Sequence, residues 1–271
     1  MAWGACWTAA IIAVGALLVI IGFVVIGGAG EINWEFLSTS PQGGLSGEGG
    51  ILSAIVGTIY LVILTIIIAT PLGVGAGIYL SEYARNNWFT KLIRYGVETL
   101  AGVPSIVFGL FGFALFVIAL GFSFSILSGA LTLACLVLPT IIRTTEEAIK
   151  TVPRDYREGS LALGATKWQT IKTVVLPSAM PGIVTAIILA IGRSVEETAC
   201  LYVTMGGSAN MPTSFLSNGR TLSLHLYYLA MDTTAMNKAL ATGIVLIFII
   251  IVINWVTRWI SRRYMRRLKG R

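Results

Sequence analysis

The sequence contains little charge, because Asp, Glu, Lys and Arg together make up 11% of its 271 residues. Soluble domains contain about 25% charged residues, so an ordinary globular protein is excluded. Hydrophobic residues make up 56% of the chain, which excludes a disordered protein as well. An all-α membrane protein with several transmembrane helices remains.

Residues for metal and disulfide chemistry are also scarce. The three cysteines, Cys6, Cys135 and Cys200, lie in apolar stretches and form no close pair, and His225 is the only histidine. We interpret the cysteines as small buried hydrophobic residues and His225 as a loop or core residue. We therefore expect no disulfide, no metal site and no cofactor in this chain.

Long uncharged stretches predict six transmembrane helices within one domain that covers residues 1–271. The stretch 100–142 is about twice as long as a bilayer core, so it must turn back, and Gly121-Phe122-Ser123 is the expected turn. The first stretch lacks a basic leader and a cleavage site, so we expect a retained helix rather than a signal peptide. The expected spans are 9–28, 51–80, 100–120, 124–142, 181–203 and 239–260.

The basic residues are distributed unevenly along the chain. Of the 19 Lys and Arg residues, 16 lie in three segments on one side of the expected membrane, at 85–94, 143–172 and 258–271. The positive-inside rule predicts that these segments and both termini are cytoplasmic, in a plasma (inner) membrane protein surrounded by lipid. The net charge of +7 therefore reflects orientation, and we expect no nucleic-acid partner.

Prolines and glycines also punctuate the expected spans. Pro71, Pro104 and Pro139 are expected to kink their helices, with neighbouring helices satisfying the freed backbone groups. Three small residues in the second span are expected to allow close approach of another helix. They are Gly73, Gly75 and Gly77.

The cytoplasmic segment 143–180 contains the clearest local signals. Pro153 suits the first turn of a helix, and Gly164 suits a helix stop. Thr166 and Gln169 form a capping box for a second helix, which Pro177 is expected to end. The prediction is two short helices with a fixed elbow over 154–176. A solvated linker or a helix lying on lipid headgroups is the alternative.

This segment resembles the coupling loop of ABC importer permeases, whose pattern is Glu-Ala-Ala-x₃-Gly-x₉-Ile-x-Leu-Pro. Gly159 and Ser160 replace the two alanines here, and Val174 replaces the isoleucine. The resemblance implies that the loop docks onto a separate ATPase subunit. The implied coupling residues are Glu158, Gly159, Ser160, Ala162, Gly164, Ala165, Leu176 and Pro177.

Further stretches resemble the phosphate-uptake branch of this family, at 100–112, 138–148, 163–170 and 192–198, and Tyr79-Leu-Ser-Glu82-Tyr-Ala resembles its A-type subunit. The resemblance implies a type I ABC importer permease that imports inorganic phosphate by alternating access. Its implied partners are a related C-type permease, an ATP-binding subunit dimer and an external phosphate-binding protein. The chain has no Gly-x₄-Gly-Lys-[Ser/Thr] loop, so ATP hydrolysis is expected in another subunit and not here.

Arg193 is the candidate residue of the substrate pathway, because it falls near the middle of the fifth expected span. An arginine there costs about 2.5–3.5 kcal/mol to insert, so it must face the bundle interior or a wet cavity. Glu197 and Glu196 are both within reach as partners, and the motif favours Glu197. Phosphate would exchange for the carboxylate on the guanidinium. The alternative is an ion pair that only locks two helices together.

Arg143 is a second pathway candidate, at the inner end of the fourth span, although it is equally well explained as a positive-inside anchor. Two other functions stay open for the chain. A permease of this class could import sulfate, molybdate or phosphonate, and an ion-coupled transporter or channel could use Arg193 and Glu197 as a gate.

Overall fold

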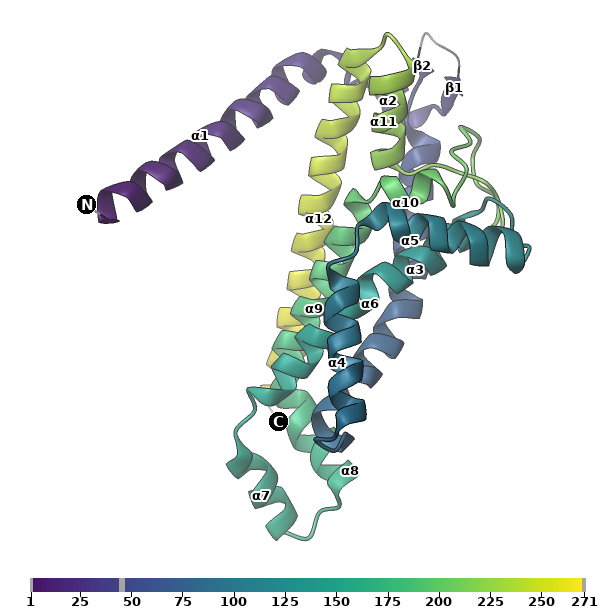
Figure 1. Ribbon diagram of the computed structural model, residues 1–271. Coiled ribbons are helices and arrows are strands. Elements are labelled where there is room, and N and C mark those ends of the chain that lie inside the picture. Colours follow the sequence, from purple (N-terminus) through teal and green to yellow (C-terminus); the bar gives the residue numbers. More distant parts are fainter. Residues whose placement is uncertain (1, 44–46, 270–271) are drawn as a thin grey trace.

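A computed structural model describes residues 2–43 and 47–269 as a bundle of long helices (Figure 1). Within these residues, five helices are long and apolar enough to cross a membrane, and a bent helix pair counts as a sixth span when its halves are combined. The long helices are α1 (Ala2–Gly28), α3 (Leu52–Ile78), α6 (Ile126–Lys150), α9 (Leu176–Glu196) and α12 (Met236–Lys269).

Short elements occupy the two ends of the bundle (Figure 1). One end holds η1 (Ala29–Glu31), α2 (Trp34–Ser38), the antiparallel strands β1 (Pro41–Gly43) and β2 (Glu48–Gly49), and α11 (Leu222–Asp232). The opposite end holds α7 (Arg154–Ala162) and α8 (Lys167–Thr170), which extend beyond the long helices. Two π-helical turns adjoin this second end, η2 (Tyr79–Tyr83) after α3 and η4 (Ile171–Val175) before α9.

Helices α3 and α6 form the centre of the bundle and approach each other closely at two glycines. A Cβ atom added to Gly73 would lie 2.6 Å from the Ile141 side chain, and one added to Gly77 would lie 2.7 Å from Thr145. The prediction of close helix approach is therefore confirmed at both positions. It is wrong for Gly75, where an added Cβ would meet open space.

The third predicted span differs from the structure. A continuous helix over 100–120 was expected, but the chain breaks between α4 (Trp88–Ala101) and α5 (Ser105–Gly112), and the two directions differ by 103°. Pro104 lies at the break, where it supplies no backbone N–H and restricts the residue before it. The π-helical turn η3 (Phe113–Ala119) continues α5. The predicted turn follows, with Gly121 and Ser123 both at positive φ.

The fifth predicted span also differs at both ends. Pro177 was expected to end a helix, yet α8, η4 and α9 run on as one helix over Lys167–Glu196. The π-helical turn η4 shifts the hydrogen-bond register immediately before Pro177, which allows the helix to pass the missing N–H. At the other end, the helix stops at Glu196 instead of Val203, because Glu197 is extended and a separate short helix, α10 (Ala199–Tyr202), follows.

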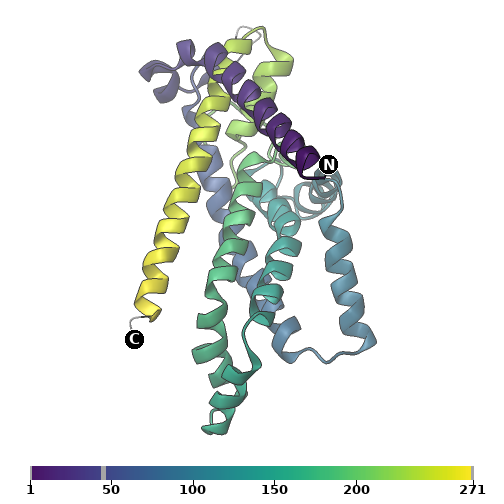
Figure 2. The same ribbon diagram turned by 90° about the vertical axis from the view of Figure 1, so that its left-hand side faces the viewer.

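Helix α1 slopes away from the other helices (Figures 1 and 2). It approaches the bundle only near its C-terminal end, where a Cβ added to Gly28 would lie 2.5 Å from the backbone nitrogen of Ala241 in α12. Its apolar side chains are largely exposed, from Trp7 to Ile26. The first span is therefore held to the rest of this chain mainly through α12.

Candidate functional site

Arg193 lies in the last turn of α9 and contacts both glutamates that follow it. Its Nη1 is 3.0 Å from Oε1 of Glu196, and its Nη2 is 3.2 Å from Oε2 of Glu197. The sequence left the choice of partner open, and the structure brings both carboxylates to the same guanidinium. We call Arg193, Glu196 and Glu197 the ion cluster.

The three side chains of the ion cluster differ in exposure. Arg193 and Glu196 are 46% and 56% exposed on this chain, whereas Glu197 is only 4% exposed. The neighbouring Ser194 and Val195 are buried in the bundle. The cluster thus has a buried base in Glu197 and an open side that faces away from the bundle.

Local backbone geometry places Glu197 at the base. Its backbone is extended, so it ends α9, and its Oε1 accepts a hydrogen bond from the backbone N–H of Cys200 at the start of α10. Its backbone carbonyl accepts a hydrogen bond of 2.7 Å from the Ser223 hydroxyl in α11. The residue that pairs with Arg193 therefore also connects three helices.

Arg143 is not part of the ion cluster. It lies on α6, where its guanidinium pairs with Glu147 one turn further along and with Glu98 of α4, at 3.2 Å and 3.3 Å. All three side chains are more than half exposed. Arg143 also lines a cavity of about 160 Å³ between α4 and α6, and its role in a pathway stays a prediction.

The predicted elbow is present at the end of the bundle that bears α7 and α8. Thr166 and Gln169 form the capping box reciprocally, so this prediction is confirmed. Gly164 has φ +84°, a left-handed conformation that a glycine adopts without strain. A hydrogen bond of 2.9 Å between the hydroxyls of Ser160 and Thr170 joins α7 to the end of α8. The two arms of the elbow are therefore fixed relative to each other.

The coupling residues implied by the resemblance separate into two groups. Glu158, Gly159, Ala162 and Gly164 are exposed on the elbow, with Ser160 and Ala165 half-buried beside them. Leu176 and Pro177 are instead half-buried within the long helix, and Leu176 packs against the cluster around Ile149 and Val175. The second group supports the elbow from the bundle and does not form its outer surface.

The elbow itself carries several exposed apolar side chains, which the sequence analysis did not identify. Leu163 is 90% exposed and Trp168 is 59% exposed, and Tyr156 and Leu161 are exposed beside them. Four such side chains at the tip of one end are typical of a protein-binding surface. The available signal was the position of these four side chains in a loop that also contains several charged residues.

Comparisons with known proteins agree on one family. Residues 69–266 match the family described as binding-protein-dependent transport system inner membrane component. A probable ABC transporter permease protein, YqgI of Bacillus subtilis, is 39% identical over 233 residues, which cover 81% of this chain and 78% of that protein. The phosphate transport system permease protein PstA of Yersinia pestis is 37% identical over 219 residues, covering 80% and 74%.

Solved structures agree at the level of the fold. A bacterial alginate ABC transporter, in complex with an alginate pentasaccharide-bound periplasmic protein, gives a TM-score of 0.66 at 16% identity and covers 97% of this chain and 98% of the matched chain. An inward-facing MetNI methionine ABC transporter gives 0.61 at 19% identity and covers 80% and 95%. The family match over residues 69–266, together with the 39% identity to the Bacillus subtilis permease, shows that the chain belongs to the binding-protein-dependent transport system inner membrane component family.

Proposed function

We propose that this chain is the membrane-spanning permease subunit of an ATP-driven importer of inorganic phosphate. The observation that supports phosphate most directly is the 37% identity to a phosphate transport system permease, together with an arginine whose partners are two carboxylates. A guanidinium presents a planar set of donors that matches phosphate oxygens. The same relatives give no reason to prefer sulfate, molybdate or phosphonate as cargo.

The ion cluster acts in this proposal as a relay. Glu196 and Glu197 hold the guanidinium of Arg193 when no anion is present, so that phosphate exchanges with a carboxylate instead of meeting a bare charge. This exchange keeps binding weak enough for release, as conduction requires. Arg143, near the cytoplasmic end of α6, would be a later contact on the same route.

The exposure of the cluster supports a second permease subunit. About half of the Arg193 and Glu196 side chains are exposed on this chain, and exposing an arginine to lipid costs about 2.5–3.5 kcal/mol. A related C-type permease packed against this face would cover the charges and complete the pathway. The pathway would then lie between the two permeases.

The elbow supplies the connection to ATP hydrolysis. An ATP-binding subunit dimer would contact the exposed side chains of α7 and α8, and an external phosphate-binding protein would deliver phosphate at the opposite end, near α2 and α11. Closure of the ATPase pair would move the elbow and open the path outward, and hydrolysis would reset it. The chain would perform no catalysis itself.

Uptake of labelled phosphate tests the proposal. The assembled complex is reconstituted in vesicles with ATP on the ATPase side and the loaded binding protein on the other, and uptake must require both ATP and this chain. Arg193→Gln should reduce uptake roughly tenfold to a hundredfold, because it removes a charge-assisted contact with the anion. Arg258→Gln, an exposed arginine of α12, is the matched control and should leave uptake unchanged.

Two results would contradict this function. Uptake that excess sulfate or molybdate abolishes and excess phosphate spares would assign another oxyanion. Normal phosphate uptake by Arg193→Gln would exclude the relay.

A further inference from the structure

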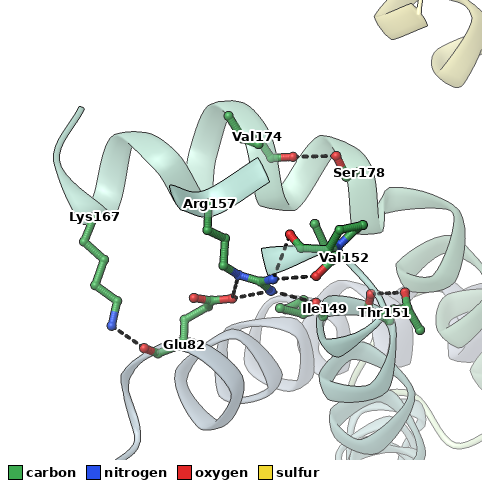
Figure 3. A network of polar contacts seen from close by, with 10 residues as sticks. Glu82, Ile149, Thr151, Val152, Arg157, Lys167, Val174 and Ser178 are labelled. Carbon is green, nitrogen blue, oxygen red and sulfur yellow. Dashed lines mark hydrogen bonds and ion pairs between the residues drawn. The ribbon is translucent and has the colours of Figure 1, made fainter. Parts of the chain in front are cut away.

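A network of charged side chains connects the cytoplasmic end of α3 to the elbow (Figure 3). Its residues belong neither to the ion cluster nor to the outer surface of the elbow. Glu82 lies on η2, the π-helical turn that continues α3, and Arg157 lies on α7. Oε1 of Glu82 is 3.0 Å from Nη2 and 3.2 Å from Nε of Arg157. The two residues are 75 positions apart in the sequence.

Arg157 also contacts the end of α6. Its Nη2 donates a hydrogen bond of 2.9 Å to the carbonyl of Ile149, and its Nη1 donates one of 2.5 Å to the carbonyl of Val152 (Figure 3). Carbonyls at a helix C-terminus lack intrahelical partners and attract positive charge. One guanidinium therefore joins the ends of α3 and α6 to α7.

Lys167 adds the fourth element. Its Nζ donates a hydrogen bond to the backbone carbonyl of Glu82, and Lys167 is the first residue of the helix that continues into α9 (Figure 3). Both arms of the elbow thus converge on Glu82, one through its carboxylate and one through its backbone.

The pair between Glu82 and Arg157 is largely buried, with side chains 10% and 20% exposed. Removing one member of such a pair leaves a charge without its partner, which is far more costly than breaking an exposed pair. The planar guanidinium also fixes the direction of approach, because Nε and Nη2 both donate to Oε1 of Glu82 while Nη2 and Nη1 also donate to the carbonyls of Ile149 and Val152. This pair can therefore transmit a displacement, which an exposed pair such as Arg143–Glu98 cannot.

Helix α7 has few other attachments to the bundle. None of its residues is buried, so it has no apolar face packed against the long helices. The hydroxyl bond between Ser160 and Thr170 holds α7 to the other arm of the elbow, but not to α3 or α6. Movement of α7 must then reach α3 through polar contacts, and Arg157 makes them.

We propose that Glu82 and Arg157 form the mechanical link through which displacement of α7 by the ATPase subunit moves α3. Both are positioning residues that touch neither phosphate nor ATP. The proposal rests on the proposed function, since it assigns a transmission step to the same elbow. Because α3 packs closely on α6 at Gly73 and Gly77, a shift of its cytoplasmic end would be passed along the central helix pair.

The ratio of phosphate taken up to ATP hydrolysed tests this link. Equal amounts of assembled complex carrying Glu82→Gln or Arg157→Gln are compared with the unaltered complex. Both variants should co-purify with the ATPase subunit and hydrolyse ATP, while the ratio falls about 2- to 30-fold, the range for substitutions along an element that couples two sites. The double variant should be no worse than either single variant, since both remove the same interaction.

Two further variants keep the test decisive. Arg157→Lys retains the charge but loses the planar set of donors, so an intermediate ratio is expected even if the glutamine variants fold poorly. Glu98→Gln is the matched control, because it removes an exposed carboxylate at the same end of the bundle while Arg143 keeps Glu147. Its ratio should equal that of the unaltered complex.

The outcomes separate the link from the proposed function. A normal ratio of phosphate taken up to ATP hydrolysed in both glutamine variants would overturn the link. Loss of the ATPase subunit from both variants would also overturn it, because the pair would then serve only to keep the ATPase docked. If the unaltered complex takes up no phosphate, the proposed function fails. Stimulation of ATP hydrolysis by the binding protein then replaces the ratio as the measure of coupling, and the link predicts its loss in both variants.

Discussion

At the residue scale, Glu197 performs two tasks because its two carboxylate oxygens face different segments. Oε2 pairs with Arg193 at the end of α9, and Oε1 accepts the N–H of Cys200 in α10. Glu196 pairs with the same guanidinium from an exposed position, and its carboxylate has no second partner among residues 2–43 and 47–269. The two glutamates are adjacent in the sequence, but they differ in burial and in the number of partners of their carboxylates.

Their substitution should therefore have unequal effects on stability. Glu197→Gln is expected to lower the free energy of unfolding by about 1–3 kcal/mol, the range for leaving buried polar groups without their partners. Glu196→Gln should cost about 1 kcal/mol or less, as exposed ion pairs do. Thermal unfolding of the purified complex in detergent measures both, and equal shifts would contradict the buried role of Glu197.

His225 is a titratable residue that lies buried beside a positive charge. Its Nδ1 lies 3.0 Å from Nη1 of Arg220. A guanidinium can only donate hydrogen bonds, so Nδ1 must accept this one and the imidazole must remain neutral. Burial, and then the Arg220 charge, lower the pKa of His225 below its ordinary value of about 6.5. The structure agrees with the expectation of a loop or core residue, and Arg220 itself is held by the Gly207 carbonyl.

The lowered pKa predicts how stability depends on pH. The unfolded chain binds a proton on His225 at a higher pH than the folded chain does, so stability is full above about pH 6.5 and decreases as the pH falls below it. His225→Gln should flatten the part of the pH dependence that this residue causes. Unfolding temperatures measured between about pH 5 and about pH 7.5 test this, and an unchanged slope in the variant would refute it.

At the element scale, the elbow depends on one backbone conformation. Gly164 has φ +84°, and an added Cβ would meet no neighbouring atom, so the only cost of a side chain there is backbone strain. Gly159, by contrast, is inside α7 and also has open space around it. An added side chain clashes at neither glycine, so comparing the two positions isolates the effect of backbone strain.

We predict opposite results for alanine at these positions. Gly164→Ala should destabilise the elbow by about 1–2 kcal/mol and weaken co-purification of the ATPase subunit, because an L-residue resists the left-handed conformation. Gly159→Ala should preserve or slightly improve helix stability. Pull-down of the ATPase subunit by each variant measures the difference, and equal retention by both would show that the elbow tolerates another conformation.

At the scale of the whole molecule, charge and shape define two ends. Arg94 of segment 85–94 pairs with Glu146 of segment 143–172, and Arg157 of the second segment pairs with Glu82, which lies just before the first. These contacts are at the end that bears α7 and α8 (Figure 1). Lys238 is instead bonded to the Gly47 carbonyl beside the strands. The structure separates the two groups of charges that the positive-inside rule assigns to opposite sides of the membrane.

The orientation itself is a prediction that thiol labelling in whole cells can test. In a background where the three native cysteines are replaced by alanine, Asn210→Cys should react with a membrane-impermeant reagent added outside. Asp155→Cys, on the exposed side of α7, should react only after the cells are opened. The reverse pattern would place the elbow outside and exclude contact with a cytoplasmic ATPase.

The sequence by itself determined the features that neighbouring residues encode. Uncharged stretches located the long helices α1, α3, α6 and α12, the capping box located the start of the second elbow helix, and Gly164 located the bend, because each signal acts within a few residues. The attraction between Arg193 and the following glutamates is equally local. The Arg271 end of the basic C-terminal run lies outside the described residues.

Only the tertiary structure decided where the helices break and which distant charges meet. Helix α3 is apolar on nearly all faces, so no periodic pattern indicates which of its sides packs, and close contacts such as Gly77 with Thr145 appear only once α3 and α6 are paired. The end of α9 at Glu197 depends on α10 and α11, which supply its partners. Glu82 and Arg157 are joined in the same way, since contact between distant charges depends on how the helices are arranged and not on the residues beside them.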